Sequence, residues 1–175
     1  MVRYRRNFIP GGSYFFTVSL HDRQARSLTE HIDLLRAAFR DTQRRYPFSI
    51  DAIVILPEHL HAIWTLPNGD GDYPGRWRHL KGHFTRVLHR AGVSIRGNTG
   101  GEGDLWQPSD WEHTLRDAVD RQRHVDYIHF NPVRHGHVAA AGDWPYSSFH
   151  RHVRQGLLPV DWVSSGDFGE GKFGE

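Results

Sequence analysis

Both the fold and the chemistry of this chain are suggested by one stretch, Ile53 to Pro67, which reads IVILPEHLHAIWTLP. Two apolar runs flank a Pro-Glu break, and the second run opens with His-Leu-His. If the second run is a strand, alternation places His59 and His61 on one face and Leu60 on the other. Two imidazoles about 7 Å apart on a rigid strand can share one divalent cation. A chain with 14 histidines also produces His-x-His by chance, so the spacing leaves a purely structural explanation open.

Length and composition indicate a single globular domain. The chain has 175 residues, of which 38% are hydrophobic and 13% aromatic, enough to bury a real core. It contains no Cys, which excludes disulfides and thiolate zinc sites and makes a cytoplasmic location the simpler expectation. No apolar run approaches a membrane span of about 18 residues, and MVRYRRNFIP at the start lacks the apolar region of a signal peptide. We therefore expect no membrane partner, and the absence of a GxxxxGK[ST] phosphate loop argues against a nucleotide cofactor.

The positive charges are clustered along the chain. The formal net charge is only +2, but residues 73–101 contain no acidic residue. The cations of this segment are Arg76, Arg78, Lys81, Arg86, Arg90 and Arg96, and a short basic arm at residues 1–10 adds Arg3, Arg5 and Arg6. A basic surface with interleaved aromatic residues favours a nucleic-acid partner, and Arg suits bidentate contacts with phosphates and bases. A solvated surface helix is the alternative explanation.

Periodicity and breaker residues predict an α+β fold. The predicted strands are residues 13–20, 48–56, a strand starting at 59, and 111–115, and the predicted helices are 28–45, 75–91, 117–131 and 146–155. A capping box at Ser27–Glu30 is expected to open the first helix, and Pro132 to stop the third. The short Pro-Glu link allows only an antiparallel pairing of the strands on either side of it. The element order predicts an antiparallel sheet with helices packed on it, of ferredoxin-like character.

The chain is expected to form one domain over residues 1–162. It divides into the basic arm 1–10, a core of about 11–135 and a C-terminal extension 136–162. Residues 163–175 are Gly-rich and acidic and are predicted to be a flexible tail. A second hypothesis is that this tail lies over the basic groove and competes with DNA.

Four segments in a fixed order resemble a known family. They are GGSYFFTVSL at 11–20, PEHLH at 57–61, DYIHFNPVRHG at 126–136 and DWPYSSFHRHV at 143–153. Together they resemble the REP-associated tyrosine transposases, single-copy relatives of small insertion-sequence transposases in the HUH superfamily of single-strand nucleases. The resemblance runs from Tyr4 to about Trp162, and it implies the RRM-like HUH nuclease fold.

The resemblance implies roles for four residues. His59 and His61 match the metal ligands, Tyr127 the catalytic nucleophile and Asn131 a third polar ligand, with Mg²⁺ or Mn²⁺ as the metal. Helical spacing agrees, because Arg123, Tyr127 and Asn131 recur at i, i+4 and i+8. Attack on single-stranded DNA would leave a 5′-phosphotyrosine and a free 3′-OH. The alternatives are that Tyr127 is an ordinary helix residue packed on the core, and that Asn131 merely precedes a proline.

Two details of the same segments bear on the site. Glu58 could orient a His ligand, but a solvent-facing turn carboxylate is the interpretation we favour here. At Ser109-Asp110 the family carries a basic-plus-aromatic pair before the Trp, so the departure puts that DNA contact in doubt.

The predicted function is a metal-dependent single-strand DNA endonuclease and strand transferase that acts on hairpin-forming palindromic repeats. A domesticated DNA- or RNA-hairpin-binding protein that cleaves nothing is the alternative. A two-histidine phosphoesterase is disfavoured because the chain lacks a pair of His-x-Thr/Ser motifs. A monomer is expected, with a dimer left open. The candidate DNA contacts are Arg3, Arg5, Arg6, Arg76, Arg78, Lys81, Arg86 and Arg123.

Overall fold

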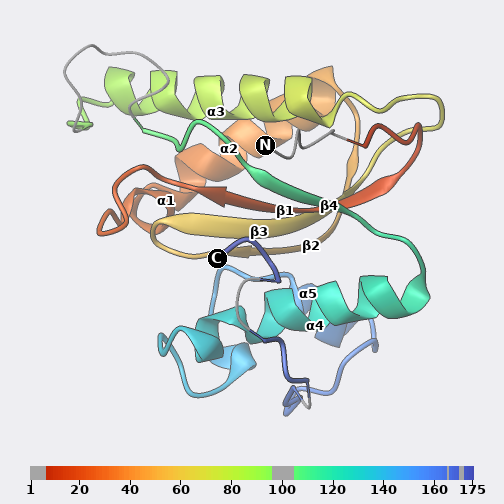
Figure 1. The fold of residues 1–175 in the computed structure, drawn as a ribbon. Helices are drawn as coiled ribbons and strands as arrows, with labels where there is room; N and C mark the ends of the chain where they lie inside the picture. The colour runs from red at the N-terminus through yellow and green to blue at the C-terminus, as the bar shows by residue number, and fades with distance from the viewer. Residues whose placement is uncertain (1–6, 96–104, 165, 170–171) are drawn as a thin grey trace.

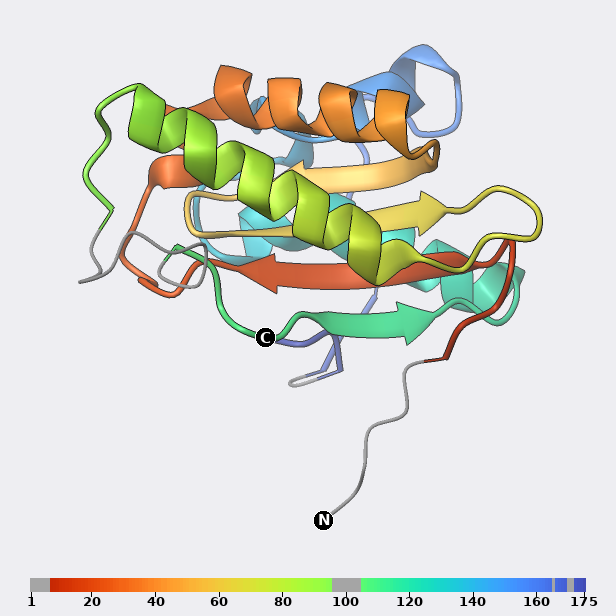
Figure 2. The same cartoon turned by 90° about the horizontal axis from the view of Figure 1, so that it is seen from above.

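The computed structural model describes residues 7–95, 105–164, 166–169 and 172–175, which form a four-stranded antiparallel sheet between two layers of helices (Figures 1 and 2). The sheet order is β2-β3-β1-β4. The strands are β1 (Ser13–Ser19), β2 (Ser49–Ile55), β3 (His59–Thr65) and β4 (Trp111–Thr114). The helices are α1 (Ser27–Glu30), α2 (Ile32–Arg45), α3 (Tyr73–Arg90), α4 (Ala118–Arg134), the 3₁₀ turn η2 (Ala141–Asp143) and α5 (Phe149–Arg154). The predicted α+β class is confirmed.

The strand β3, which carries the His-Leu-His sequence, lies inside the sheet. It pairs antiparallel with β2 on one side and with β1 on the other. The register opposes Ser19 to His59 and Thr17 to His61. The short Pro-Glu link between β2 and β3 explains this pairing, because it can only turn the chain back on itself.

Helices α2 and α3 cover one face of the sheet (Figures 1 and 2). Leu60, Ala62 and Trp64 of β3 belong to the core cluster on this face, together with residues of both helices. Trp64 stacks on Trp77 of α3 with ring centroids 4.0 Å apart and an interplanar angle of 16°. Alternation along β3 therefore turns the two histidines to the opposite face, as predicted.

Helices α4 and α5 and the last part of the chain lie against that opposite face (Figure 1). A second core cluster joins Phe15 of β1 and Ile63 of β3 to Val125 and Ile128 of α4. Because α4 packs beneath the central strands, the side of the helix that bears Tyr127 faces the strand that bears the histidines.

Two helix starts differ from the prediction. Residues 28–45 form two helices, because the chain breaks at His31 between α1 and α2. The capping box does not form: Arg26 is the N-cap of α1, and it makes no side-chain capping bond. Helix α3 begins at Tyr73, since the Asp72 side chain accepts a hydrogen bond from Gly75 N at 2.9 Å and caps the helix earlier.

The prediction that Pro132 stops the third helix is wrong. Helix α4 starts after Asp117, whose side chain accepts from Asp120 N at 2.8 Å, and runs through Pro132 to Arg134. Proline lacks one N–H, but a single missing bond in the last turn is tolerable when the turn is held by packing. The His135 N–H still donates to Asn131 O at 3.0 Å, so the turn closes beyond the proline. This extra turn places Arg134 and His135 beside the candidate site.

Three smaller findings complete the architecture. Helix α5 starts at Phe149 rather than at 146. Among the described residues, no helix is both long and apolar enough to cross a lipid bilayer. Arg3, Arg5, Arg6 and Arg96 lie outside the described residues.

Candidate active site

His59 and His61 are completely buried between the sheet and α4, and each is held by one ring nitrogen. His59 Nδ1 donates to Glu58 Oε1 at 2.8 Å, so Glu58 orients the ring and is not the solvent-facing carboxylate we expected. His61 Nδ1 lies 2.8 Å from Thr17 Oγ1 on the neighbouring strand. Such second bonds fix the orientation and tautomer of metal-binding imidazoles. The Nε2 atoms of both rings are left to face a common point.

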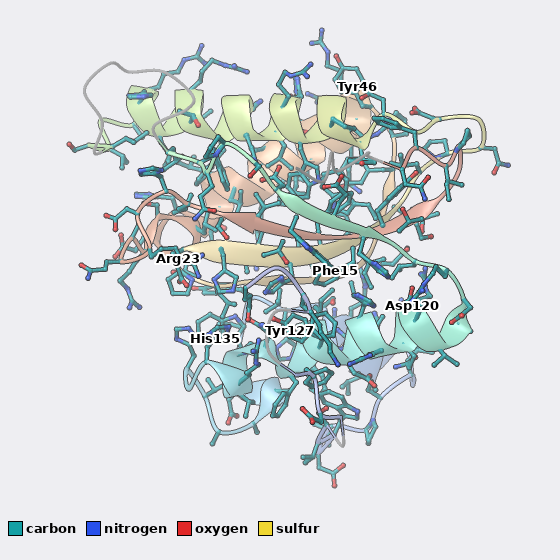
Figure 3. The ribbon with its side chains drawn as sticks, in the orientation of Figure 1. Phe15, Arg23, Tyr46, Asp120, Tyr127 and His135 are labelled. Atoms are coloured by element: carbon teal, nitrogen blue, oxygen red, sulfur yellow. The ribbon has the colours of Figure 1, made fainter. Side chains whose placement is uncertain are left out.

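The side chain of Glu175 occupies that common point, a residue that the sequence analysis did not identify. Its Oε1 lies 2.6 Å from His61 Nε2 and 3.1 Å from His59 Nε2. The same oxygen accepts from Asn131 Nδ2 and from His135 Nε2, both at 3.0 Å. Its Oε2 forms an ion pair with Arg134. In Figure 3, Tyr127 and His135 are labelled beneath the sheet, in the layer where this cluster lies.

The donor set fits a divalent cation. Thr17 Oγ1 donates its proton to Phe173 O at 2.5 Å, so His61 Nδ1 must donate to Thr17, and the Nε2 of a neutral His61 is a lone pair. Burial lowers the pKa of His61 to about 4 and so favours the neutral ring. His61 Nε2 and Glu175 Oε1 lie 2.6 Å apart, so either a proton or a cation must lie between these two acceptors. Two imidazoles and an oxygen donor suit Mn²⁺ and related ions, and Mg²⁺ to a lesser degree.

Asn131 faces the same point with its Nδ2 atom, and a flip of its side-chain amide would bring the oxygen Oδ1 there. Its side chain is fully buried, and its Oδ1 has no hydrogen-bond partner among the residues that the structure describes. A buried carbonyl oxygen without a partner is costly, and a cation or a substrate proton would satisfy it. The structure thus brings His59, His61 and Asn131 together, as the family resemblance implied.

Tyr127 lies at the same site and is fully buried. Its ring packs edge-on against His61, with centroids 5.2 Å apart. Its hydroxyl accepts a hydrogen bond from Arg134 NH1 at 2.8 Å. Burial, and then the nearby Glu175 carboxylate, raise the pKa of the Tyr127 phenol far above its ordinary value, while Arg134 acts in the opposite direction. In this arrangement the phenol is protonated at neutral pH.

Electrostatic attraction holds Glu175 and the histidines around it together. Burial acts against ionisation of Glu175, but its bonds to His135, His59 and His61 outweigh burial and hold the pKa of the carboxyl well below its usual range. Burial also opposes protonation of His59, yet Glu175 and Glu58 together raise its pKa. The carboxylate therefore acts as a counter-ion in the place where a cation would sit.

The described residues of the segment that carries Glu175 are packed on the site. The Phe173 ring stacks on Tyr127 with centroids 3.9 Å apart and an interplanar angle of 8°. Phe168 packs edge-on against the same ring at 5.4 Å. Both Phe side chains are buried. Two Phe residues in an otherwise Gly-rich and acidic segment were the signal in the sequence that could have predicted this docking.

The candidate DNA contacts divide between the two layers. Arg78 and Arg86 are exposed on α3, whereas Arg123 is exposed on α4, with its guanidinium 5.7 Å from the Phe173 ring. Lys81 is half-buried and forms a 2.5 Å ion pair with Asp110, the residue at which this chain departs from the family pattern. Arg76 is only 3% exposed, and Asp70 and three backbone carbonyls hold its guanidinium. Its geometry is that of a structural residue.

A groove runs between α3 and the β4 edge of the sheet. It has a volume of about 300 Å³ and is lined by Trp77, Trp106, Arg78 and Lys81, among others. Lys81 Nζ lies 5.6 Å from the centroid of the Trp106 ring. Trp77 and Trp106 are only 3% and 2% exposed, so the groove offers mainly polar and charged groups such as those of Arg78 and Lys81.

Comparisons with known proteins agree with this geometry. No family model matches the chain. A REP-associated tyrosine transposase of Escherichia coli K12 is 46% identical over 173 residues, which cover 98% of both chains. A relative from Haemophilus influenzae with the same family name is 44% identical over 169 residues, covering 95% of this chain and 96% of its own.

Among solved structures, a REP-associated tyrosine transposase bound to a REP hairpin superposes with a TM-score of 0.87 at 46% identity, over 100% of this chain and 98% of that one. A Deinococcus radiodurans structure at 20% identity, with a TM-score of 0.50 over 69% of this chain and 92% of its own, supports the fold alone. Identity at this level over almost the whole length establishes the family. The chain is an enzyme of the REP-associated tyrosine transposase family.

Proposed function

We propose that this protein is a metal-dependent single-strand DNA endonuclease and strand transferase that acts on hairpin-forming repeats through Tyr127. One observation carries the proposal. The Tyr127 ring packs on His61, and the Nε2 atoms of His59 and His61 converge with Asn131 on the point that Glu175 Oε1 occupies, each histidine being oriented by a second bond. An ordinary packing tyrosine does not require this arrangement of donors.

The chemistry follows from these groups. A divalent cation, Mg²⁺ or Mn²⁺, held by His59, His61 and Asn131 would polarise the scissile phosphate and stabilise the charge that develops on it. The Tyr127 oxygen attacks phosphorus in line with the bond to O3′; the new P–O bond forms, the P–O3′ bond breaks, and a 5′-phosphotyrosine and a free 3′-OH result. The phenol proton passes to solvent, and the leaving O3′ takes one up. Arg134, which donates to the phenol oxygen, favours this ionisation because it stabilises the phenolate.

The tail has to leave before DNA can enter. Glu175 stands where the cation and the scissile phosphate would lie, and Phe173 covers the Tyr127 ring. Both a carboxylate and a phosphate are anions, so they compete for the same positive groups. We propose that residues 172–175 compete with the substrate. The sequence suggested a tail that competes with DNA over the basic groove, and this proposal assigns the competition to the candidate active site.

The DNA partner is proposed to be a hairpin with an adjoining single strand, by analogy with the relative that is bound to a REP hairpin. Exposed Arg78, Arg86 and Arg123 would contact the backbone. We also propose DNA contacts for the basic arm with Arg3, Arg5 and Arg6, but not for Arg76, because it is buried. We propose action as a monomer in the cytoplasm, without a nucleotide cofactor.

The test is covalent capture. Labelled single-stranded hairpin repeats are incubated with the protein and Mn²⁺ or Mg²⁺ and run on a denaturing gel, with Tyr127→Phe as the matched variant. We expect a protein-linked DNA band that requires the metal and is absent from Tyr127→Phe. Cleavage that survives in Tyr127→Phe would sink the tyrosine mechanism. If the wild type and a variant that lacks residues 172–175 both bind the hairpin without cleaving it, the result would favour the alternative of a non-cleaving hairpin-binding protein.

A further inference from the structure

A second group of metal-binding side chains lies on the outer face of the helical layer, across the sheet from the candidate active site. Asp41 comes from α2, and His79 and His83 come from successive turns of α3; the two helices lie side by side in Figure 2. Asp41 Oδ2 is 3.1 Å from His79 Nε2 and 3.1 Å from His83 Nδ1. All three ligand atoms lie within 4.8 Å of one another.

We propose that Asp41, His79 and His83 form a binding site for a divalent transition-metal ion of the zinc class, with water as the fourth ligand. A tetrahedral zinc ion with bonds of about 2.0–2.2 Å separates its ligand atoms by about 3.3 Å. The two observed separations of 3.1 Å are close to that value, so the ion can enter with small side-chain rotations. The two protons now shared with Asp41 Oδ2 leave or move to the other ring nitrogens.

The surroundings support a formed site. His79 and His83 are four residues apart, so their side chains lie on the same face of α3. The second carboxylate oxygen of Asp41 accepts from Arg44 at 2.7 Å, which fixes the carboxylate and leaves Oδ2 for the ion. The Tyr46 ring packs edge-on against His79 at 5.4 Å and limits its rotation.

Among the described residues, one further candidate group lies outside the active site, and it is less suitable. His113, Asp120 and His124 also lie close together, but His124 Nδ1 is engaged by the backbone carbonyl of Asp120 at 2.7 Å. The same Asp120 oxygen that meets His113 also accepts from Arg116 N at 3.0 Å. These atoms are committed to hydrogen bonds that a metal would have to break.

The ion would have a structural consequence. It would join α2 to α3, and α3 carries the exposed Arg78 and the groove residue Lys81. Two imidazoles and one carboxylate select Zn²⁺, Ni²⁺ or Cu²⁺ over Mg²⁺. The proposed site shares no residue with the active site, so its failure would leave the proposed function untouched.

The experiment measures zinc on chelator-treated protein. Bound Zn²⁺ per chain is obtained by equilibrium dialysis, and the thermal midpoint is recorded in EDTA and in Zn²⁺. The variants are His83→Gln and Asp41→Asn, with His89→Gln as the control, since His89 is exposed on the same helix outside the group. At a zinc concentration 100-fold above the dissociation constant, a folded-state site raises the midpoint by about 5–10 °C.

We expect His83→Gln and Asp41→Asn each to bind one zinc fewer than the wild type and to lose that rise, while His89→Gln behaves like the wild type. The midpoints in EDTA identify a variant that is merely destabilised. The difference between variants isolates this site from any zinc bound by His59 and His61. Equal zinc uptake and an equal zinc-induced rise in wild type and both variants would overturn the proposal.

Discussion

The contact of Glu175 with the candidate active site predicts the direction in which a change at this residue shifts metal affinity. Glu175→Gln keeps the size of the side chain and removes its charge. The lost carboxylate has contacts of 2.6–3.1 Å with His59, His61, Asn131 and His135, in addition to its ion pair with Arg134. We expect the tail to dissociate more readily and the affinity for Mn²⁺ to rise.

The magnitude follows from these contacts. A hydrogen bond to a charged group contributes about 1.5–3 kcal/mol, and the amide retains some of the contacts. A net loss of about 2–3 kcal/mol increases the open fraction about 30–140-fold. While the closed state dominates, the apparent dissociation constant for Mn²⁺ falls by the same factor, because only open chains bind. The rate of the covalent step at limiting Mn²⁺ should rise in parallel.

The assay is calorimetric titration with Mn²⁺, together with the yield of protein-linked DNA at subsaturating Mn²⁺. Asp167→Asn is the control, because it removes one carboxylate from the same segment at an exposed position away from the site. It should leave both quantities unchanged. If Glu175 were itself a metal ligand, Glu175→Gln would weaken Mn²⁺ binding, and that result would refute the competing tail.

Three further predictions concern single positions. Thr17→Val removes the bond that orients His61, but it also removes a bond to Phe173 O, so the titration compares chains that both lack residues 172–175; there the change should weaken Mn²⁺ affinity about 10–100-fold, and equal affinities would contradict this role of Thr17. Arg78→Ala should weaken hairpin binding and lower the slope of log affinity against log salt by about 1, whereas an unchanged slope would remove Arg78 from the DNA surface. Burial opposes ionisation of Asp120, but its bonds to His113 and to the Arg116 N–H outweigh burial and lower its pKa below 3.8 in the folded protein. The ionised carboxylate therefore stabilises the fold above pH 3.8, and this stabilisation is lost as the pH falls through the lower folded-state pKa. Asp120→Asn should therefore cost about 1–3 kcal/mol in urea unfolding at pH 7, and the gap to the wild type should narrow below pH 3.8; a gap that is constant with pH would contradict this account.

The sequence by itself determined the parts of this protein that depend on local periodicity. A strand alternates with a period of two residues, so His-Leu-His necessarily presents both imidazoles to one face of the sheet. Helical spacing likewise placed Tyr127 and Asn131 on one side of α4. The order of the motifs indicated the family, which the 46% identical relative confirmed.

Other features depended on contacts that no local pattern contains. Pro132 alone predicts a helix end, but packing against the sheet and a closed last turn carry α4 on to Arg134. The basic run suggested a DNA contact at Arg76, yet Asp70 and the backbone around Pro47 bury its guanidinium. Charge along the sequence does not tell which cations the fold will neutralise.

The largest difference between the sequence-based prediction and the structure lies at the candidate active site. Glu175 is 114 residues from His61 and 116 from His59, and the segment that carries it reads as a Gly-rich acidic tail. Only the tertiary structure brings its carboxylate between the two imidazoles. The physical reason is that a cluster of buried, electropositive donors attracts an anion, and local sequence does not specify whether that anion is a phosphate of DNA or a carboxylate of the same chain.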